Sequence, residues 1–245
     1  MTSSGDPDVD AILESLEAAH ADEVPDPREG LRELKKRRVH RRISDVATAM
    51  FLVHGFDEVT VAQIAAACEV SPQTVFNYFP TKESMLFDRF GSRISGVADA
   101  VRERGSATLL ETVVQALAGG IRPAQRGPLD EARQLHLLRL LFSATGSPSL
   151  AGARLANFAQ FTEEMSVALA NRVHADPCDP EVQLATFVIA GLVRVRQQAT
   201  FTHVQHASSL AALDEAIQRD LRRGAQLAEP TLTAFDHNRR EQVEN

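Results

Sequence analysis

The sequence predicts an all-α fold, on the strength of three observations. Apolar side chains recur three or four residues apart through most of the 245 residues, which is the period of a helix. We find no strand-like alternation of useful length. Residues 60–86, TVAQIAAACEVSPQTVFNYFPTKESML, spell two short helices around a tight turn, followed by a third helix. Two helices in this order form a helix-turn-helix, whose second helix can read the major groove of DNA.

Capping residues set the limits of these two helices. Thr60 is a good N-cap for the first helix, and the turn follows at Glu69-Val70-Ser71. Ser71 is a second N-cap, with Pro72 at the first helical position, where its missing N–H costs nothing. The second helix is short because Phe79 precedes a proline and is pushed out of the helical region.

A longer helix precedes this pair. Its apolar stripe has the period of a helix and consists of Ile43, Val46, Ala47, Met50 and Phe51. We expect it to stop at Gly55, a residue type that ends helices in the left-handed conformation. Three helices of this kind make a minimal DNA-binding domain over roughly residues 37–85.

At this point the N-terminal sequence resembles the tetracycline-repressor (TetR) family. The residues that carry the resemblance are Thr60-Val61, Ile64-Ala65, Val70-Ser71, Thr74, Tyr78-Phe79, Lys82 and Leu86. The resemblance implies an all-helical homodimeric regulator whose second domain binds a small molecule. This chain departs from the family pattern at Glu69, where glycine is frequent, and at Phe76, where tyrosine is frequent. A non-glycine residue at positive φ in the turn would cost about 1 kcal/mol.

The DNA-binding candidates lie on the second helix and around it. Gln73, Thr74 and Asn77 are expected to face base edges, because Gln and Asn can pair bidentately with adenine. Thr60, Tyr78 and Lys82 are expected to hold phosphates, although Tyr78 can also be a packed surface residue. The full set is Arg37, Arg38, Arg41, Arg42, Thr60, Ser71, Pro72, Gln73, Thr74, Phe76, Asn77, Tyr78 and Lys82.

The distribution of charge supports the DNA hypothesis. The net charge of −7 argues against a general nucleic-acid coat protein. Residues 1–27 carry eight acids and no Lys or Arg, whereas residues 28–42 carry eight bases against two acids. The basic run lies directly before the helix-turn-helix, where it can meet phosphates. The alternative is a solvated helix face.

The sequence predicts no cofactor and no metal centre. The two cysteines, Cys68 and Cys178, are far apart, and no spacing of metal ligands occurs. His203 and His206 lack a third ligand and are interpreted as surface residues. Because the N-terminus lacks a hydrophobic signal region and no apolar run could span a membrane, we expect a cytoplasmic protein with reduced thiols.

Four regions follow from these patterns. We expect an acidic, flexible arm at 1–30, in which a short helix can form, the DNA-binding domain at 31–85, a ligand-binding and dimerisation domain at 86–228, and a polar tail at 229–245. A connecting helix at 81–104 leads into the second domain. Five further helices are expected at 106–119, 128–145, 148–175, 180–204 and 208–228, the last ending before Pro230.

The segment 184–193, LATFVIAGLV, is apolar on all sides and must be covered all round. In a helical regulator it can face a ligand pocket on one side and a partner subunit on the other. Together with the helix at 208–228 it predicts a four-helix dimer interface. The alternative is the central core helix of a monomer.

Three function classes remain open on the sequence. The leading hypothesis is a DNA-binding transcriptional regulator, a ligand-released repressor that binds a near-palindromic operator as a homodimer. Residues 148–199 also resemble, more loosely, the TetR proteins that bind acyl-CoA-like ligands. The pocket candidates are Leu138, Arg139, Phe142, Arg154, Phe158, Phe161, Met165, Phe187, Arg194 and Phe201, with Arg196 as a further cation. An architectural DNA-binding protein without a ligand is the second class, and a helical enzyme is the third, although the common catalytic motifs are missing.

Overall fold

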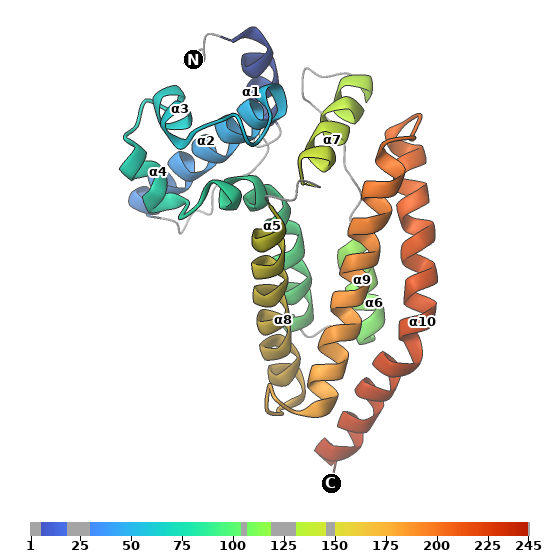
Figure 1. The fold of residues 1–245 in the computed structure, drawn as a ribbon. Coiled ribbons are helices and arrows are strands. Elements are labelled where there is room, and N and C mark those ends of the chain that lie inside the picture. The colour runs from blue at the N-terminus through green and yellow to red at the C-terminus, as the bar shows by residue number, and fades with distance from the viewer. Residues whose placement is uncertain (1–5, 19–29, 104–106, 119–130, 146–149, 245) are drawn as a thin grey trace. The chain divides into compact units, whose positions relative to one another are not determined.

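The computed structural model describes residues 6–18, 30–103, 107–118, 131–145 and 150–244 (Figure 1). Within this described part the chain is helical and has no strand, so the predicted all-α fold is confirmed. The chain divides into two compact units. Unit 1 comprises residues 1–90 and 122–150, and unit 2 comprises residues 91–121 and 151–245.

Unit 1 contains the helix-turn-helix. Its helices are α1 (Pro7–Ala18), α2 (Leu31–His54), α3 (Val61–Ala67), α4 (Pro72–Tyr78), the first part of α5 (Lys82–Arg102) and α7 (Glu131–Thr145). The second half of α2 is buried from Ile43 to Leu52 and forms the middle of the core. Ile64 of α3, Val75 of α4 and Leu86 of α5 pack into the same cluster. The expected three-helix arrangement is therefore present.

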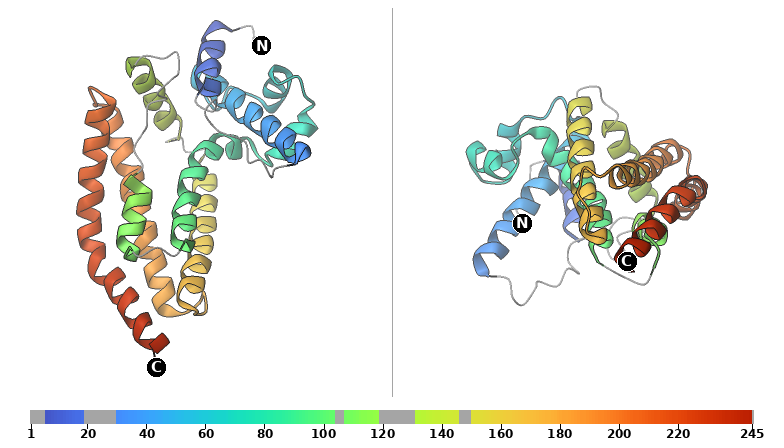
Figure 2. Two further views of the ribbon diagram at one scale, coloured as in Figure 1. Left: turned by 180° about the vertical axis from the view of Figure 1, so that it is seen from behind. Right: turned by 90° about the horizontal axis from the view of Figure 1, so that it is seen from below.

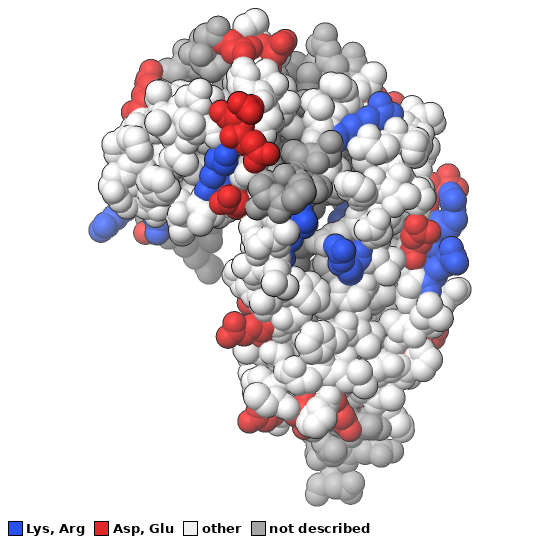
Figure 3. Space-filling view, viewed as in Figure 1, with Lys and Arg blue, Asp and Glu red and all other residues white. Residues whose placement is uncertain are grey.

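Helix α1 lies in the segment that the sequence suggested as a flexible arm. Its apolar residues Val9 and Leu13 are buried in the core of unit 1, and α1 packs along α2. Because these apolar side chains recur at helical spacing, the segment can form a helix that packs on the core although most of its other residues are acidic or polar. Acidic side chains gather over α1 on the face shown in Figure 3. Residues 1–5 and 19–29 of the expected arm lie outside the described residues.

Helix α2 begins at Leu31, six residues before the expected minimal domain, so residues 31–42 of the basic run are part of a helix. The helix ends at Gly55, whose φ of 89° lies in the region that favours glycine. The Gly55 N–H donates to the Phe51 carbonyl at 3.0 Å and closes the last turn.

Unit 2 is a bundle of the remaining part of α5 with α6 (Leu109–Ala118), α8 (Ala151–Val173), α9 (Pro180–Val204) and α10 (Leu210–Glu244). Helix α9 lies between α8 and α10, as the opposite views of Figures 1 and 2 agree. Its first turn is capped by Asp179, whose carboxylate accepts the Glu181 N–H at 2.9 Å, and Pro180 occupies the first turn. These residues explain why the expected limits of α9, 180–204, agree with the structure.

Helix α10 corrects the expected polar tail. The sequence predicted a helix that stops at 228, but α10 continues through Pro230 to Glu244. Proline removes one backbone donor and bends a helix. Ala228, Leu232 and Phe235 are nevertheless buried in the core of unit 2, and this packing keeps the segment helical. The C-terminal part of α10 changes direction in Figures 1 and 2.

Helix α6 is held at both ends by side chains of α9 and α10. The Leu109 N–H donates to the Asp236 carboxylate at 2.7 Å, which satisfies a free donor in its first turn. At the other end, Arg196 Nε donates to the Leu117 carbonyl at 2.7 Å, and Gln218 Nε2 donates to the Ala118 carbonyl at 3.0 Å. Arg196 is thus bonded to α6 in this structure.

Helix α7 lies against α2, although the sequence placed it within a second domain at 86–228. The sequence predicted helix boundaries near Gly119, Pro128 and Gly146. These three positions lie outside the described residues. In the described part of the chain, no helix combines the length and the apolar character that crossing a membrane requires.

Candidate nucleic-acid interface

The turn between α3 and α4 is fixed by backbone bonds. The Val70 N–H donates to the Ala65 carbonyl, and the Glu69 N–H donates to the Ala66 carbonyl, at 3.0 and 3.1 Å. This pair of bonds is a Schellman motif, which requires its penultimate residue in the left-handed region. Glu69 fills that place with a φ of 57°. The expected positive φ at a non-glycine residue is therefore present.

Helix α3 starts with a capping box. The Gln63 N–H donates to Thr60 Oγ1 at 3.3 Å, and the Thr60 N–H donates to Gln63 Oε1 at 2.8 Å. The Thr60 hydroxyl also donates to Gln63 Oε1 at 2.8 Å. Thr60 is exposed, as a phosphate contact requires, and its hydroxyl hydrogen already has a partner. Gln63 was missed by the sequence reasoning, although a Gln three residues after Thr60 is the signature of this box.

Helix α4 starts and ends as the sequence predicted. Ser71 Oγ accepts the Thr74 N–H at 3.1 Å, and Pro72 occupies the first turn. The Phe79 backbone leaves the helix with a φ of −132°, immediately before Pro80.

The two sides of α4 differ in chemistry. Val75 and Phe79 are buried in the core of unit 1. Pro72, Gln73, Phe76 and Asn77 are exposed, and Thr74 and Tyr78 are half-buried on the flank. The exposed side therefore combines amide side chains with one phenyl ring.

Gln73 and Asn77 are linked on the exposed side. Gln73 Nε2 donates to Asn77 Oδ1 at 3.1 Å, four residues apart along the helix. With about 100° of rotation per residue, both side chains point away from Val75 and Phe79. The bond holds the two amides next to one another, so they can present donors and acceptors together.

Tyr78 packs against α2. The centre of its ring lies 6.2 Å from the centre of the His40 ring in an edge contact, and His40 also stacks at 4.5 Å on Phe79. His40 was not among the candidate residues, because a lone histidine before a core helix gives no specific signal. The phosphate role of Tyr78 remains a prediction beside the packing role.

Lys82 is engaged within unit 1. Its ammonium donates to the carbonyls of Phe56 at 2.8 Å and Val59 at 3.1 Å, and it lies 4.3 Å from the centre of the Phe56 ring. These contacts tie the first turn of α5 to the loop between α2 and α3. Its predicted contact with a phosphate is untested.

The predicted basic residues all lie on α2, before its buried half. Arg38 is exposed, and Arg37, Arg41 and Arg42 are half-buried. Arg42 forms an ion pair with Glu17 of α1. Sequence reasoning missed Glu17, because only the packing of α1 on α2 brings this acid to the basic run.

Cys68 follows α3 and lies next to Arg42 of α2. Its Sγ donates to the Arg42 carbonyl at 3.9 Å, and burial raises the pKa of the thiol to about 11 against an opposing effect of the Arg42 charge. Cys178 is exposed. Within the described residues, no three His, Cys, Asp or Glu side chains come together in a way that could hold a metal ion.

The predicted ligand-binding residues lie on three helices, α7 of unit 1 and α8 and α9 of unit 2. Phe161 and Met165 are buried in the core of unit 2, whereas Phe158, Phe187, Arg194 and Phe201 are exposed. Arg154 is half-buried on α8. Leu138, Arg139 and Phe142 are half-buried on α7, which belongs to unit 1. These ten assignments stay predictions.

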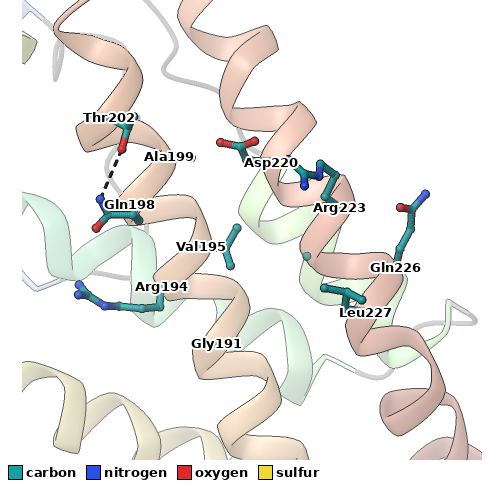
Figure 4. Close-up of a pocket in the computed structure, with 11 residues that line it drawn as sticks. Gly191, Arg194, Val195, Gln198, Ala199, Thr202, Asp220, Arg223, Gln226 and Leu227 are labelled. Carbon is teal, nitrogen blue, oxygen red and sulfur yellow. Dashed lines mark hydrogen bonds between the residues drawn. The ribbon is translucent and has the colours of Figure 1, made fainter.

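A groove of about 730 Å³ lies between α9 and α10. Val195 of α9 and Leu227 of α10 point toward the space between the two helices, with Arg194 and Arg223 on either side (Figure 4). Gly224 lets the helices approach closely, because a Cβ there would lie 3.3 Å from the Leu192 side chain. Arg194 is the predicted ligand-binding residue that lines this groove.

Comparisons with known proteins agree with the helix-turn-helix. The N-terminal sequence model of the family described as "Bacterial regulatory proteins, tetR family" matches residues 43–88. The HTH-type transcriptional regulator TcmR of Streptomyces glaucescens is 30% identical over 183 residues, which cover 69% of this chain and 76% of TcmR. The mycofactocin biosynthesis regulator MftR of Mycobacterium tuberculosis is 34% identical over 65 residues, 25% of this chain and 33% of MftR.

Among the similar solved structures is that of the TetR-family repressor FadR of Thermus thermophilus in complex with lauroyl-CoA. It is 24% identical, and the alignment covers 75% of this chain and 91% of FadR with a TM-score of 0.45. The family match and the likeness to TcmR rule out the hypothesis of a helical enzyme. The chain belongs to the tetR family of bacterial regulatory proteins, and it is a DNA-binding transcriptional regulator.

Proposed function

We propose that this regulator is a repressor that binds a near-palindromic operator as a homodimer and leaves it when a small effector binds. The observation that carries the DNA part of the proposal is the exposed side of α4, where Gln73 and Asn77 are held together by a hydrogen bond. A helix of this kind enters the major groove with its polar side toward the bases. Because the function requires access to bacterial DNA, the proposed location is the cytoplasm.

In this proposal Gln73, Thr74 and Asn77 read bases, and Thr60, Tyr78, Lys82 and the arginines of α2 hold phosphates. Amide side chains recognise adenine through its N6 and N7 atoms. The test begins with selection of bound sites from random DNA. Gln73→Ala and Asn77→Ala are then expected to lose about 1–3 kcal/mol of binding free energy and to relax the preference at one base pair each.

Gln160→Ala is a matched control for these variants. Gln160 lies on α8 and donates to Glu164 at 2.9 Å, so it has the same kind of bond four residues along a helix. It should leave operator binding unchanged. If the α4 variants also leave affinity and base preference unchanged, the assignment of α4 as the reading helix is wrong.

The proposed dimer contact uses α9 and α10. On α9, Leu184 and Phe187 are 58% and 55% exposed, and on α10 Leu227 is 85% exposed. Gly191, one turn from Phe187, lines the groove with Leu227. A neighbouring set of large exposed apolar side chains favours a protein interface. Two reading helices related by a two-fold axis would bind a site with inverted symmetry.

Sedimentation at micromolar concentration tests the dimer. The wild-type protein should be a dimer, and Phe187→Asp should shift it toward the monomer because a carboxylate would be buried in an apolar contact. Leu155→Asp is the control, since Leu155 is 70% exposed on α8, outside the proposed contact. A monomeric wild-type protein, or an operator without inverted symmetry, would contradict the dimer.

The proposed effector has an apolar body and an anionic end, as an acyl-CoA ester has. The residues named from the sequence remain the candidates for its binding, with an arginine at its anionic end. Binding should weaken operator affinity by about 5- to 150-fold, and operator DNA should weaken effector binding by the same factor. Acyl-CoA esters of several chain lengths, free fatty acids and planar aromatic compounds would be titrated into the protein–operator complex. If none releases DNA and the second domain proves solidly packed, the architectural alternative takes the place of the repressor.

A further inference from the structure

Phe76 is an apolar side chain on the polar side of α4. It is 45% exposed, whereas Val75 and Phe79, the neighbouring apolar residues of this helix, are buried in the core. The helix therefore does not need Phe76 for its own packing in the way that it needs the other two. An exposed phenyl ring leaves apolar surface in water, and contact with an apolar group of a partner would remove that surface.

The position of Phe76 limits what this partner can be. It lies three residues after Gln73 and directly before Asn77, and residues three or four apart are neighbours on a helix surface. Gln73 and Asn77 are bonded to one another at 3.1 Å on the same exposed side. An element that brings these amides to base edges therefore brings the Phe76 ring to the same groove.

The chemistry of the ring narrows the partner further. A phenyl ring has no group that can donate to a phosphate oxygen or to a base edge. The major groove presents hydrogen-bonding groups on all four bases, and its one apolar group is the C5-methyl of thymine. A phenyl side chain can therefore distinguish one base from the others by contacting this methyl group.

We propose that Phe76 contacts the C5-methyl group of a thymine in the operator and selects for thymine at that position. The inference rests on the proposed role of α4 as the reading helix, and it assigns to Phe76 a part of the specificity that Gln73 and Asn77 do not supply. Tyrosine at this position would add a hydroxyl, and with it the possibility of a hydrogen bond to a phosphate instead.

The experiment removes the methyl group from the DNA and the ring from the protein. Each thymine of the selected operator is replaced singly by deoxyuridine, which changes no hydrogen-bonding group. Wild-type protein should lose about fourfold in affinity at one position of a half-site, the effect of one buried methyl group. Phe76→Ala should bind the thymine operator more weakly and show no further loss on that replacement. Phe76→Leu keeps an apolar side chain and should keep part of the methyl effect.

Thermal unfolding of the full-length variants verifies that each is folded, and Phe76→Leu provides a second variant if Phe76→Ala is not. The proposal is overturned if no thymine responds to deoxyuridine, if the selected site has no thymine, or if the same thymine responds equally in wild type and Phe76→Ala. In those cases Gln73→Ala and Asn77→Ala show whether α4 still reads the operator. An altered base preference in these two variants would leave the proposed function intact while removing the role of Phe76.

Discussion

The ammonium of Lys82 closes the loop that precedes α3 by binding the carbonyl of Phe56 at 2.8 Å and lying 4.3 Å above the centre of the same residue's ring. Its second bond, to the Val59 carbonyl, is made one residue before Thr60, the N-cap of α3. A cation in the first turn of α5 therefore helps to fix where the helix-turn-helix begins.

Replacement of Lys82 by methionine should lower the free energy of unfolding by about 1–3 kcal/mol, because two charge-assisted hydrogen bonds to half-buried carbonyls are lost. Urea denaturation measures this change. Operator affinity, measured over a range of salt concentrations, separates the two roles of the side chain. Log affinity decreases with log salt. If this decrease is shallower in the methionine variant than in the wild type by about 0.9 per subunit, Lys82 also contacts a phosphate. Unchanged stability would contradict the role of Lys82 in the loop.

Glu69→Gly should stabilise the protein by about 0.5–1 kcal/mol. The turn holds Glu69 at a φ of 57°, where a Cβ is strained and glycine is not, and the greater freedom of glycine in the unfolded chain offsets part of the gain. Thermal unfolding measures the effect. His174→Gly is the matched comparison, since His174 has a φ of 54° at the end of α8 in unit 2. A loss of stability for Glu69→Gly would show that the strain is smaller than the combined effect of the Glu69 side chain and of glycine's freedom in the unfolded chain.

Glu17→Gln should raise operator affinity at low salt by up to about fivefold. The substitution removes the carboxylate that pairs with Arg42, so the guanidinium meets less competition when a phosphate approaches. The gain should shrink as salt is added. Glu14→Gln is the control, because Glu14 is an exposed acid on the same helix and its loss changes the net charge equally. Equal effects of the two variants would mean that only net charge matters.

Cys178 should react with iodoacetamide faster than Cys68 at pH 8. Burial raises the pKa of Cys68 from 9.0 to about 11, so the thiolate is rare in the folded protein, and Cys178 is exposed. The raised pKa also sets a direction for stability. The contribution of Cys68 to the free energy of unfolding is complete below about pH 9, where the thiol of the unfolded chain is protonated. This contribution is lost as pH rises toward about 11. Mass spectrometry of the labelled peptides follows both sites, and equal rates would contradict the burial of Cys68.

Local signals predicted the helix-turn-helix and α9 well. Ser71 with Pro72, and Asp179 with Pro180, place a side-chain acceptor and a preset φ at the first turn of a helix, and both effects act over three or four residues. The limits of these helices therefore depend on residues that are adjacent in the sequence.

Features that depend on distant residues could not be predicted in this way. Pro230 has the local character of a helix end, and only the burial of Leu232 and Phe235 against other helices explains why α10 continues. The ligand-binding candidates also depend on distant residues, because a buried phenylalanine such as Phe161 has the same sequence pattern in a core as in a pocket wall. The pair of Arg42 with Glu17 likewise depends on the packing of α1.

The bonds at both ends of α6 have a consequence for hydrogen exchange. An isolated helix of ten residues is marginal in water, so α6 depends on its neighbours for its stability. Asp236 holds its first turn, and Arg196 and Gln218 hold its last carbonyls, so unwinding from either end must first break a bond to α9 or α10. The amides of α6 should therefore exchange at rates close to those of α9 and α10, and these three helices should open as one cooperative unit rather than one by one.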